Sequence, residues 1–289
     1  MDWESILVDI VSEVASITKP LLGTPEANES MGKGAGGDIT KRIDVIAEDL
    51  ILKKLKDTNL KIKVITEERG IVYLNCDEGT SSIDHHIIMD PIDGSFNATR
   101  NIPFVSISIA VADGSTHRVD DIHDAVVMNI PSGDIFTANK GHGTKYNGEH
   151  VSIPNRNITL NQAAMGIDLN PKKKGITRLE YMQEIESIVN APKKLRILGS
   201  NAYGTCLVAN GALDVFMDIR GNLRLLDVAG AFLIVTEAGG LVYDWKDGRL
   251  ESVLNYPLEL EQPIAIVAIS NLKLMDEIEQ KFNGLQDKK

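Results

Sequence analysis

Cysteine is scarce in this chain of 289 residues, which contains only Cys76 and Cys206. The two cysteines lie far apart in the sequence and form no Cys-x-x-Cys pair, so a disulfide framework is not expected. Low cysteine usage without a framework favours a reducing compartment, and we expect the protein to be cytoplasmic.

Basic residues are also in the minority. The chain has 30 lysines and arginines against 41 aspartates and glutamates, a formal net charge of −11. A negative field repels phosphate backbones, so general nucleic-acid binding is not expected. A small phosphorylated substrate stays compatible with this charge, because clustered carboxylates can hold bridging metal ions.

No apolar run is long enough to cross a bilayer; the stretch from Ile102 to Ala112 is too short. The start, Met1–Glu4, lacks the basic and apolar regions of a signal peptide. Hydrophobic residues make up 43% and charged residues 25% of the chain, a balance typical of soluble globular proteins. We therefore expect a soluble protein with no membrane partner.

Hydrophobic spacing divides the chain into two halves. Apolar residues recur every three or four positions over 3–18 and 41–56, which predicts two amphipathic helices, the first with Asp2 as its N-cap. Strands are expected at 61–66, 86–89 and 104–112. An antiparallel meander is expected over 124–148, and from about residue 160 strands alternate with helices. The pattern predicts an α+β half over 1–155 and an α/β half over 156–289.

The sharpest motif is Asp90-Pro91-Ile92-Asp93-Gly94-Ser95, after the predicted strand at 86–89. Proline keeps Asp90 extended, and Pro91 suits the first turn of a following helix. Carboxylates three residues apart can then converge beside the amides of Gly94 and Ser95, where they could hold a divalent metal next to a phosphate. A turn with an aspartate cap explains the hexapeptide equally well, so both interpretations stay open.

Three further acids have the same two interpretations. Glu67 follows a predicted strand, as a ligand over the carboxyl edge of a sheet would. Asp227 opens a predicted helix, where a plain N-cap is favoured if it is taken alone. Asp44 borders the apolar stripe of the second helix and could face a site or solvent. In contrast, the run from Asp120 to Asp124, which includes His123, is typical of an exposed polar turn rather than of a metal site.

Taken together, three motifs resemble those of the inositol monophosphatase family of magnesium-dependent, lithium-sensitive phosphatases. The motifs are Thr66-Glu67-Glu68, the hexapeptide at 90–95 and Leu226-Asp227-Val228-Ala229-Gly230-Ala231. They occur in the family's order over nearly the whole chain. The resemblance implies a five-layered αβαβα sandwich, a site between its two halves and a homodimer.

The resemblance also implies a ligand set for two to three Mg²⁺ ions, for which Mn²⁺ can substitute. One ion would be held by Glu67, Asp90 and the carbonyl of Ile92. A second would be held by Asp90, Asp93 and Asp227, and a weaker third would touch Glu67, near the loop residue Lys33.

The same resemblance implies the catalytic residues. Asp44 would pair with the hydroxyl of Ser95 to orient the attacking water, with Glu67 assisting at the metals, while Asp93, Gly94 and Ser95 would border the substrate phosphate. Ser95 stands where the family usually has threonine, which keeps the hydroxyl. Leu226 replaces a frequent tryptophan, which removes packing area but no ligand.

The substrate side resembles the archaeal type that hydrolyses both inositol phosphates and fructose-1,6-bisphosphate. In that type the positions of Arg196, Asn201 and Arg220 contact substrate, and arginine donors suit a second phosphate. Surface ion pairing is the alternative role for both arginines. Two other functions stay open, a 3′-phosphoadenosine 5′-phosphate phosphatase of the same superfamily and an inactive relative that serves as a binding subunit.

Overall fold

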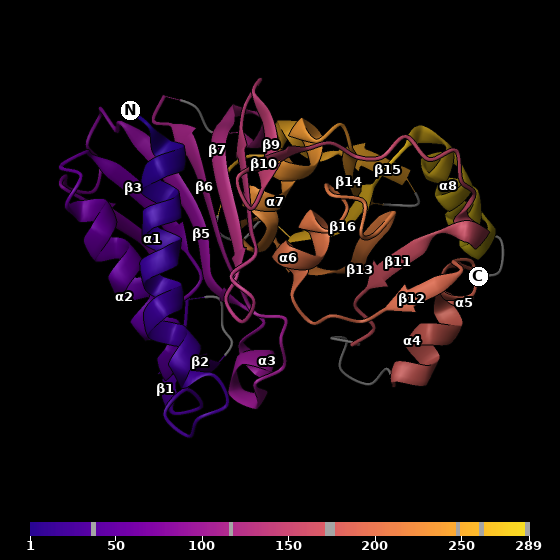
Figure 1. Ribbon diagram of the computed structural model, residues 1–289, viewed down its shortest axis with the longest axis horizontal. Coiled ribbons are helices and arrows are strands. Elements are labelled where there is room, and N and C mark those ends of the chain that lie inside the picture. Colours follow the sequence, from indigo (N-terminus) through magenta and orange to yellow (C-terminus); the bar gives the residue numbers. More distant parts are fainter. Residues whose placement is uncertain (36–38, 116–117, 171–176, 247–248, 260–262, 287–289) are drawn as a thin grey trace.

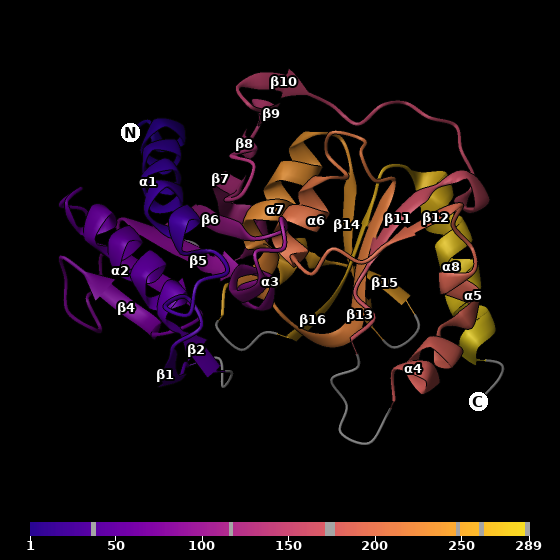
Figure 2. The same ribbon diagram turned by 60° about the horizontal axis from the view of Figure 1, so that its bottom comes forward.

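The computed structural model describes residues 1–35, 39–115, 118–170, 177–246, 249–259 and 263–286. The chain forms five layers, in which two sheets are separated by one pair of helices and covered on their outer faces by others (Figures 1 and 2). This is the predicted αβαβα order. None of the helices described is long and apolar enough to span a membrane.

The first sheet has eight strands, and neighbouring strands are antiparallel except for the parallel pair β3 and β5. In spatial order the strands are β10 (Glu149–Val151), β9 (Gly143–Tyr146), β8 (Ile135–Asn139), β7 (Ile122–Asn129), β6 (Ser106–Asp113), β5 (His85–Asp93), β3 (Ile62–Thr66) and β4 (Gly70–Leu74). The predicted meander therefore forms one wing of this sheet.

Helices α1 (Trp3–Thr18) and α2 (Arg42–Lys56) cover the outer face of the first sheet. Asp2 caps α1 as the sequence predicted, since its Oδ1 accepts a hydrogen bond of 3.1 Å from the amide of Ser5. The apolar faces of both helices pack on the strands in one buried cluster. The strands β1 (Ser30–Lys33) and β2 (Ile39–Lys41) form a separate hairpin between the two helices.

The second sheet has six strands and comes entirely from the second half of the chain. In spatial order these are β12 (Lys194–Arg196), β11 (Ala164–Ile167), β13 (Val215–Arg224), β16 (Pro263–Ile269), β14 (Leu241–Lys246) and β15 (Arg249–Ser252). The pairs β11–β12 and β11–β13 are parallel, and the other neighbouring strands of this sheet are antiparallel. The outer face is covered by α4 (Arg178–Glu184), α5 (Glu186–Val189) and α8 (Leu272–Gln286).

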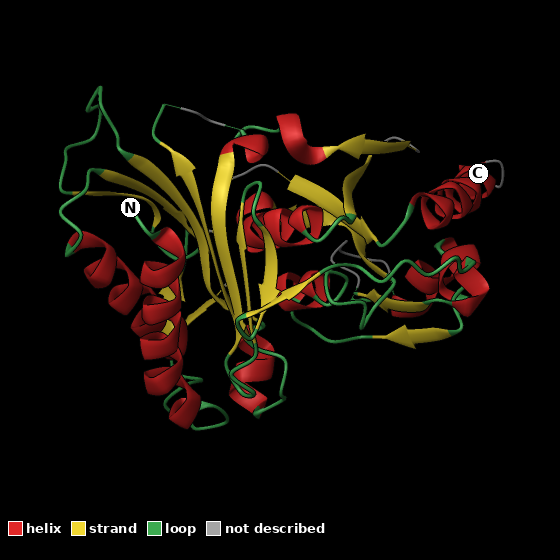
Figure 3. Cartoon of the chain, turned by 45° about the horizontal axis from the view of Figure 1, so that its top comes forward, coloured by secondary structure: helices red, strands yellow, loops and turns green. Residues whose placement is uncertain are grey.

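Helices α6 (Asn201–Cys206) and α7 (Leu225–Glu237) lie between the two sheets (Figure 3). Every residue of α7 from Leu225 to Val235 is buried, as expected of a helix that is apolar on all sides. At Gly230 the helix approaches β6 so closely that an added Cβ would lie 3.1 Å from the hydroxyl of Ser108. Glycine at this position therefore lets α7 bring its first turn to the end of the first sheet.

One local prediction is wrong. Pro91 does not begin a helix, because β5 continues to Asp93 with an irregularity in its pairing to β6 between Asp90 and Asp93. The short helix α3 (Ser95–Arg100) begins only after Gly94, whose φ is 93°. Residues with a side chain rarely adopt this φ, so glycine allows the backbone to turn here.

Candidate functional site

The site lies at the carboxyl ends of β3 and β5. Because these two strands are parallel, with Thr66 opposite Met89, the next residue of each strand lies at the same edge of the sheet, although β5 stays paired with β6 beyond this point. Glu67 and Asp90 come from these adjacent strand ends. Asp227, from the first turn of α7, reaches the same point from the layer behind the sheet.

Carboxylate oxygens of Glu67, Asp90 and Asp227 all lie within 4.8 Å of one another. Asp90 and Asp227 are buried, with 4% and 8% of each residue exposed. Such a concentration of negative charge in a poorly solvated place is unfavourable unless a cation joins it. A donor set made of carboxylate oxygens is the kind that Mg²⁺ prefers, so these residues fit a divalent oxygen-seeking cation.

The electrostatics of the cluster express the same repulsion. Burial, followed by the charges of Glu67, Asp93 and Asp227, holds the pKa of Asp90 well above its ordinary value. Burial likewise raises the pKa of Asp227 to about 6. A bound cation would reverse these shifts, because it stabilises the ionised form of each ligand.

Asp93 belongs to the same edge but faces α6. Its Oδ2 accepts hydrogen bonds from the hydroxyl of Ser200 at 2.6 Å and the amide of Ala202 at 2.8 Å, and its Oδ1 accepts one from the amide of Asn201 at 3.1 Å. Burial raises the pKa of Asp93 to about 6. The carboxylate therefore connects the first half of the chain to the start of α6 in the second half.

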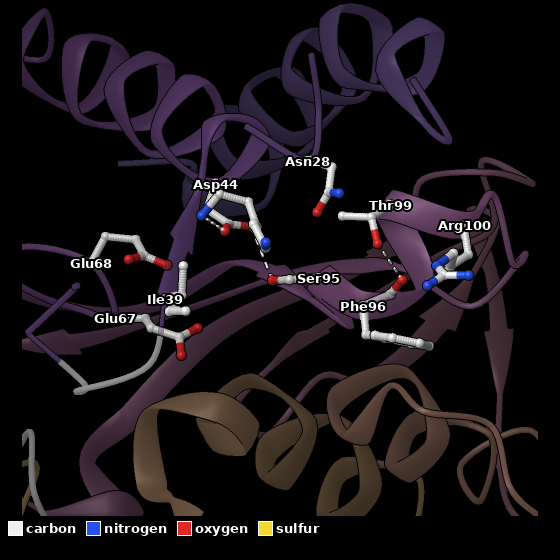
Figure 4. Close-up of a pocket in the computed structure, with 10 residues that line it drawn as sticks. Asn28, Ile39, Asp44, Glu67, Glu68, Ser95, Phe96, Thr99 and Arg100 are labelled. Atoms are coloured by element: carbon white, nitrogen blue, oxygen red, sulfur yellow. Dashed lines mark hydrogen bonds between the residues drawn. The ribbon is translucent and has the colours of Figure 1, made fainter. Parts of the chain in front are cut away.

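Asp44 and Ser95 form the predicted pair (Figure 4). The Ser95 hydroxyl lies 3.0 Å from Oδ1 of Asp44 and 3.2 Å from the carbonyl oxygen of Ile92. Oδ2 of Asp44 accepts a 2.7 Å hydrogen bond from the amide of Lys41, which fixes the carboxylate. Burial raises the pKa of Asp44 to about 6. The pair is thus a hydroxyl and a poorly solvated carboxylate held beside the acidic cluster.

Gly94 shapes the backbone next to this pair. A Cβ on Gly94 would lie 2.9 Å from the carbonyl oxygens of both Gly199 and Phe104. The tight turn leaves room for the loop from the second half of the chain to approach. Any side chain here would both strain the backbone and separate the two halves at the site.

Two cavities meet at this edge. The smaller, of about 140 Å³, is lined by the acidic cluster, Gly94, Asn201, Arg220 and Arg224. The larger, of about 450 Å³, is lined by Asp44, Glu68, Phe96 and Arg100 among others and is drawn in Figure 4. Both include Glu67 and Ser95 in their walls, so the cluster and the Asp44–Ser95 pair line adjacent cavities.

Of the four substrate and loop residues that the sequence predicted outside the three motifs, two line the smaller cavity and two line neither cavity. Arg220 and Asn201 line the smaller cavity. Arg196 is exposed on β12, where its Nη1 donates a 2.9 Å hydrogen bond to the carbonyl of Leu195. Lys33 is exposed on β1. Neither Arg196 nor Lys33 is among the described residues that line the two cavities.

Arg224 is the participant that sequence reasoning missed. Its guanidinium Nη2 contacts Oε1 of Glu67 and lies 3.0 Å from Oδ1 of Asp227. Burial lowers the pKa of Arg224, but the charges of Asp227 and Glu67 outweigh this and raise it. The spacing Arg224-Leu-Leu-Asp227 across a helix start was the available signal, because residues three apart on a helix share a face.

The comparisons with known proteins agree with this geometry. The model of the inositol monophosphatase family matches residues 2–282. The chain belongs to this family. It is accordingly a metal-dependent phosphoric monoester hydrolase.

The names of the relatives include more than one phosphatase activity. A fructose-1,6-bisphosphatase/inositol-1-monophosphatase from Methanothermobacter thermautotrophicus is 34% identical over 282 residues, which cover 96% of this chain and 95% of the relative. A bifunctional NADP phosphatase/NAD kinase from Methanocaldococcus jannaschii is 31% identical over 94% of this chain and 49% of its own length. The crystal structure of an inositol monophosphatase–fructose 1,6 bisphosphatase superposes with a TM-score of 0.80 at 27% identity, covering 97% of this chain and all of the other.

Replacing Arg224 tests whether its charge stands in for a cation. In Arg224→Met, Glu67 and Asp227 lose their partner, and removing one side of a buried ion pair costs about 3–5 kcal/mol. We expect the lower end, about 3 kcal/mol, because both carboxylates can take up protons. Urea unfolding in a chelator should show this loss of stability, and saturating Mg²⁺ should restore most of it.

Arg42→Met is the matched control for this experiment. Arg42 pairs with Glu26 and Glu29 on the surface, with 44% of its side chain exposed, so its loss should change the free energy of unfolding little, with or without Mg²⁺. Equal losses for Arg224→Met in chelator and in Mg²⁺ would show that Arg224 supports the fold alone.

Proposed function

We propose that this protein is a magnesium-dependent phosphatase that hydrolyses inositol monophosphates and fructose-1,6-bisphosphate. The observation that carries the proposal is the convergence of Glu67, Asp90 and Asp227 within 4.8 Å, beside the hydrogen-bonded pair of Asp44 and Ser95. Relatives that cover nearly the whole chain are named for these two activities. In this proposal Asp93 and the Ile92 carbonyl complete the ligand set.

The chemistry needs both parts of the site. Phosphate monoesters are doubly anionic, and their uncatalysed hydrolysis is among the slowest reactions known. Mg²⁺ bound at the acidic cluster would supply charge neutralisation of the phosphate and acidify a water molecule. The chain's own contribution is to hold the reactants in line and to receive the proton.

Asp44 and Ser95 are the groups in position to handle that proton. The Ser95 hydroxyl can accept a hydrogen bond from a water while donating its own proton to Oδ1 of Asp44, 3.0 Å away. Asp44 is held by the amide of Lys41 and has little solvent around it. We propose that this relay orients the attacking water and that Asp44 is the general base.

A substrate panel tests the proposal directly. Phosphate release should require Mg²⁺ and should be measured for inositol-1-phosphate, fructose-1,6-bisphosphate, 3′-phosphoadenosine 5′-phosphate and NADP. Turnover of the first two above the others is the expected result. Preference for 3′-phosphoadenosine 5′-phosphate would replace the proposed substrates. Absence of release from all four would favour a binding subunit.

NADP is the second candidate substrate, and one observation favours it. The relative named as a bifunctional NADP phosphatase/NAD kinase is 31% identical over 94% of this chain, and the match covers about half of that relative. The 2′-phosphate of NADP is a monoester on a ribose, so the same site chemistry serves it. Selective release of the NADP phosphate in the panel would favour this function.

Arg220 is proposed to select bisphosphorylated sugars. Its Nε donates a 2.7 Å hydrogen bond to Oδ1 of Asp218, and its Nη2 lies 2.9 Å from Oδ2 of Asp168. The side chain is 7% exposed, so these are internal ion pairs that hold the guanidinium at the cavity rather than surface contacts. A held guanidinium suits recognition of a distal phosphate.

Arg220→Ala should therefore lower the specificity constant for fructose-1,6-bisphosphate by roughly 10- to 100-fold more than that for inositol-1-phosphate, which has no second phosphate. The lost contact is a charge-assisted hydrogen bond worth about 1.5–3 kcal/mol. Asp218 is fully buried and loses its partner, so some protein will unfold. The ratio of the two constants, measured on one preparation, does not depend on the folded fraction. An unchanged ratio would contradict the proposed role.

We also propose roles for three residues outside the acidic cluster, together with an assembly and a location for the chain. Arg196 and Asn201 would contact the leaving group, and Lys33 would approach a third metal. The chain would act as a cytoplasmic homodimer whose halves divide at residues 155 and 156. Light scattering after gel filtration checks the dimer, and the specificity constants of Arg196→Ala check the first role.

A further inference from the structure

A second group of metal-ligating side chains lies at the opposite end of the first sheet. His85 begins β5, Asp113 ends β6 and His123 is the second residue of β7. The register places His85 directly opposite Asp113, and β7 is the next strand. In Figure 1 this end of β5, β6 and β7 is the one beside the N-terminus, whereas α3, which begins at Ser95, lies at the other end.

The ligand atoms of these three side chains already lie close together. Oδ1 of Asp113 is 3.5 Å from Nε2 of His123 and 3.9 Å from Nδ1 of His85, and the three atoms lie within 4.8 Å of one another. Ligands at about 2.0–2.1 Å from a tetrahedral ion are about 3.3 Å apart. Small side-chain rotations, which shorten the widest separation by at most about 1.5 Å, would bring the three atoms onto one ion.

His123 is oriented by its other nitrogen. Its Nδ1 lies 2.6 Å from Oδ2 of the buried Asp124, whose Oδ1 is fixed at 3.0 Å by the side-chain amide of Asn139. An ionised carboxylate only accepts hydrogen bonds, so the neutral imidazole carries its proton on Nδ1 and turns Nε2 toward the cluster. A carboxylate behind a histidine in this manner is the arrangement found behind metal-bound histidines.

The ring nitrogens that face the cluster have no other role in the described part of the chain. Nδ1 of His85 and Nε2 of His123 are both buried, and neither finds a hydrogen-bond partner among the described residues. The ring of Trp3 packs edge-on against His85 at 5.0 Å between centroids and shields it. A cation between these side chains would give both ring nitrogens a partner and would be attracted by the Asp113 carboxylate, which faces them.

We propose that His85, Asp113 and His123 form a binding site for a borderline divalent transition-metal ion, with Zn²⁺ as its representative. Two imidazoles and one carboxylate suit such an ion, while Mg²⁺ prefers oxygen ligands alone. The ion joins the ends of β5, β6 and β7. Asp93 lies eight positions after His85 along β5, about 26 Å at 3.3 Å per residue. This site is therefore separate from the phosphatase site and independent of the proposed function.

Metal uptake by the full-length protein tests this site. The protein is stripped with a chelator, saturated with Mg²⁺ to occupy the acidic cluster and dialysed against Zn²⁺ over a range of concentrations. Wild type, Asp113→Asn and His123→Asn are compared with His142→Asn, which removes an exposed histidine outside the cluster. The side chain of Asp113 is 65% exposed, so its replacement leaves the core intact.

We expect wild type and His142→Asn to bind one more equivalent of Zn²⁺ than the two cluster variants. Zn²⁺ affinity at that site should fall more than about 100-fold in the variants. This is a larger loss than the 10- to 100-fold decrease typical of removing a residue that only hydrogen-bonds a metal ligand. Zn²⁺ should also raise the melting temperature of wild type but not of Asp113→Asn. Co²⁺ in place of Zn²⁺ should give visible absorption bands that disappear with His123→Asn.

Two results would overturn the proposal. Equal uptake by all four proteins would place the ion elsewhere, and the same titration with Asp90→Asn would reveal whether the acidic cluster had taken it. No uptake beyond Mg²⁺ by wild type would mean that the histidines serve only as an ion pair with Asp113.

Discussion

Asp90→Asn should lower the turnover number by at least about a thousandfold at saturating Mg²⁺. Asparagine keeps the shape of the side chain but removes the charge that lies among Glu67, Asp227 and the end of β5. If Asp90 is a ligand of both proposed metal ions, its replacement weakens the binding of each ion. Both ions would neutralise charge on the phosphate, so this neutralisation is reduced at two points. A deficit of about 4 kcal/mol in transition-state stabilisation corresponds to a thousandfold in rate.

Asp90→Asn should not lower the thermal stability of the protein, although it lowers the turnover number. Burial and like charges hold the pKa of Asp90 well above its ordinary value, so an uncharged side chain relieves repulsion in the metal-free protein. A thermal melt in chelator should therefore show no decrease for Asp90→Asn. Asp244→Asn, which replaces an equally buried acid on β14 of the second sheet, should keep near-normal turnover. Turnover of Asp90→Asn within tenfold of wild type would refute the ligand role.

Ser95→Ala should lower the turnover number by about 10²- to 10⁴-fold, the usual contribution of a positioned proton acceptor, and leave KM nearly unchanged. The hydroxyl lies between Oδ1 of Asp44 and the Ile92 carbonyl, so its loss breaks the connection between water and base. Steady-state kinetics with inositol-1-phosphate measures both constants.

Two further variants separate this role from others. Ser95→Thr keeps the hydroxyl and should be close to neutral. Asp44→Asn should match the loss of Ser95→Ala, and the double variant should be little worse than either, because members of one relay do not act additively. A rise in KM alone for Ser95→Ala would make the hydroxyl a substrate contact instead.

The sequence by itself determined the local elements and the identity of the acids. Apolar spacing predicted α1, with Asp2 as its cap, and the bounds of α2 within a residue. These elements are set by short-range periodicity and capping, which neighbouring residues encode. The order of three acidic motifs also sufficed to indicate the family. What the motifs left open was which acids converge and which merely cap a turn.

Only the tertiary structure decided how distant residues meet. The sequence placed Pro91 in a helix, whereas pairing with β6 extends β5 to Asp93. Packing against neighbouring strands stabilises a buried strand by more than the local helix propensity of these residues. Arg224 gave a weak signal because its partner Glu67 lies 157 residues away. His123 looked like part of an exposed turn, yet strand register sets it beside His85 and Asp113. Register and layer packing depend on contacts between remote segments, and no local pattern encodes them.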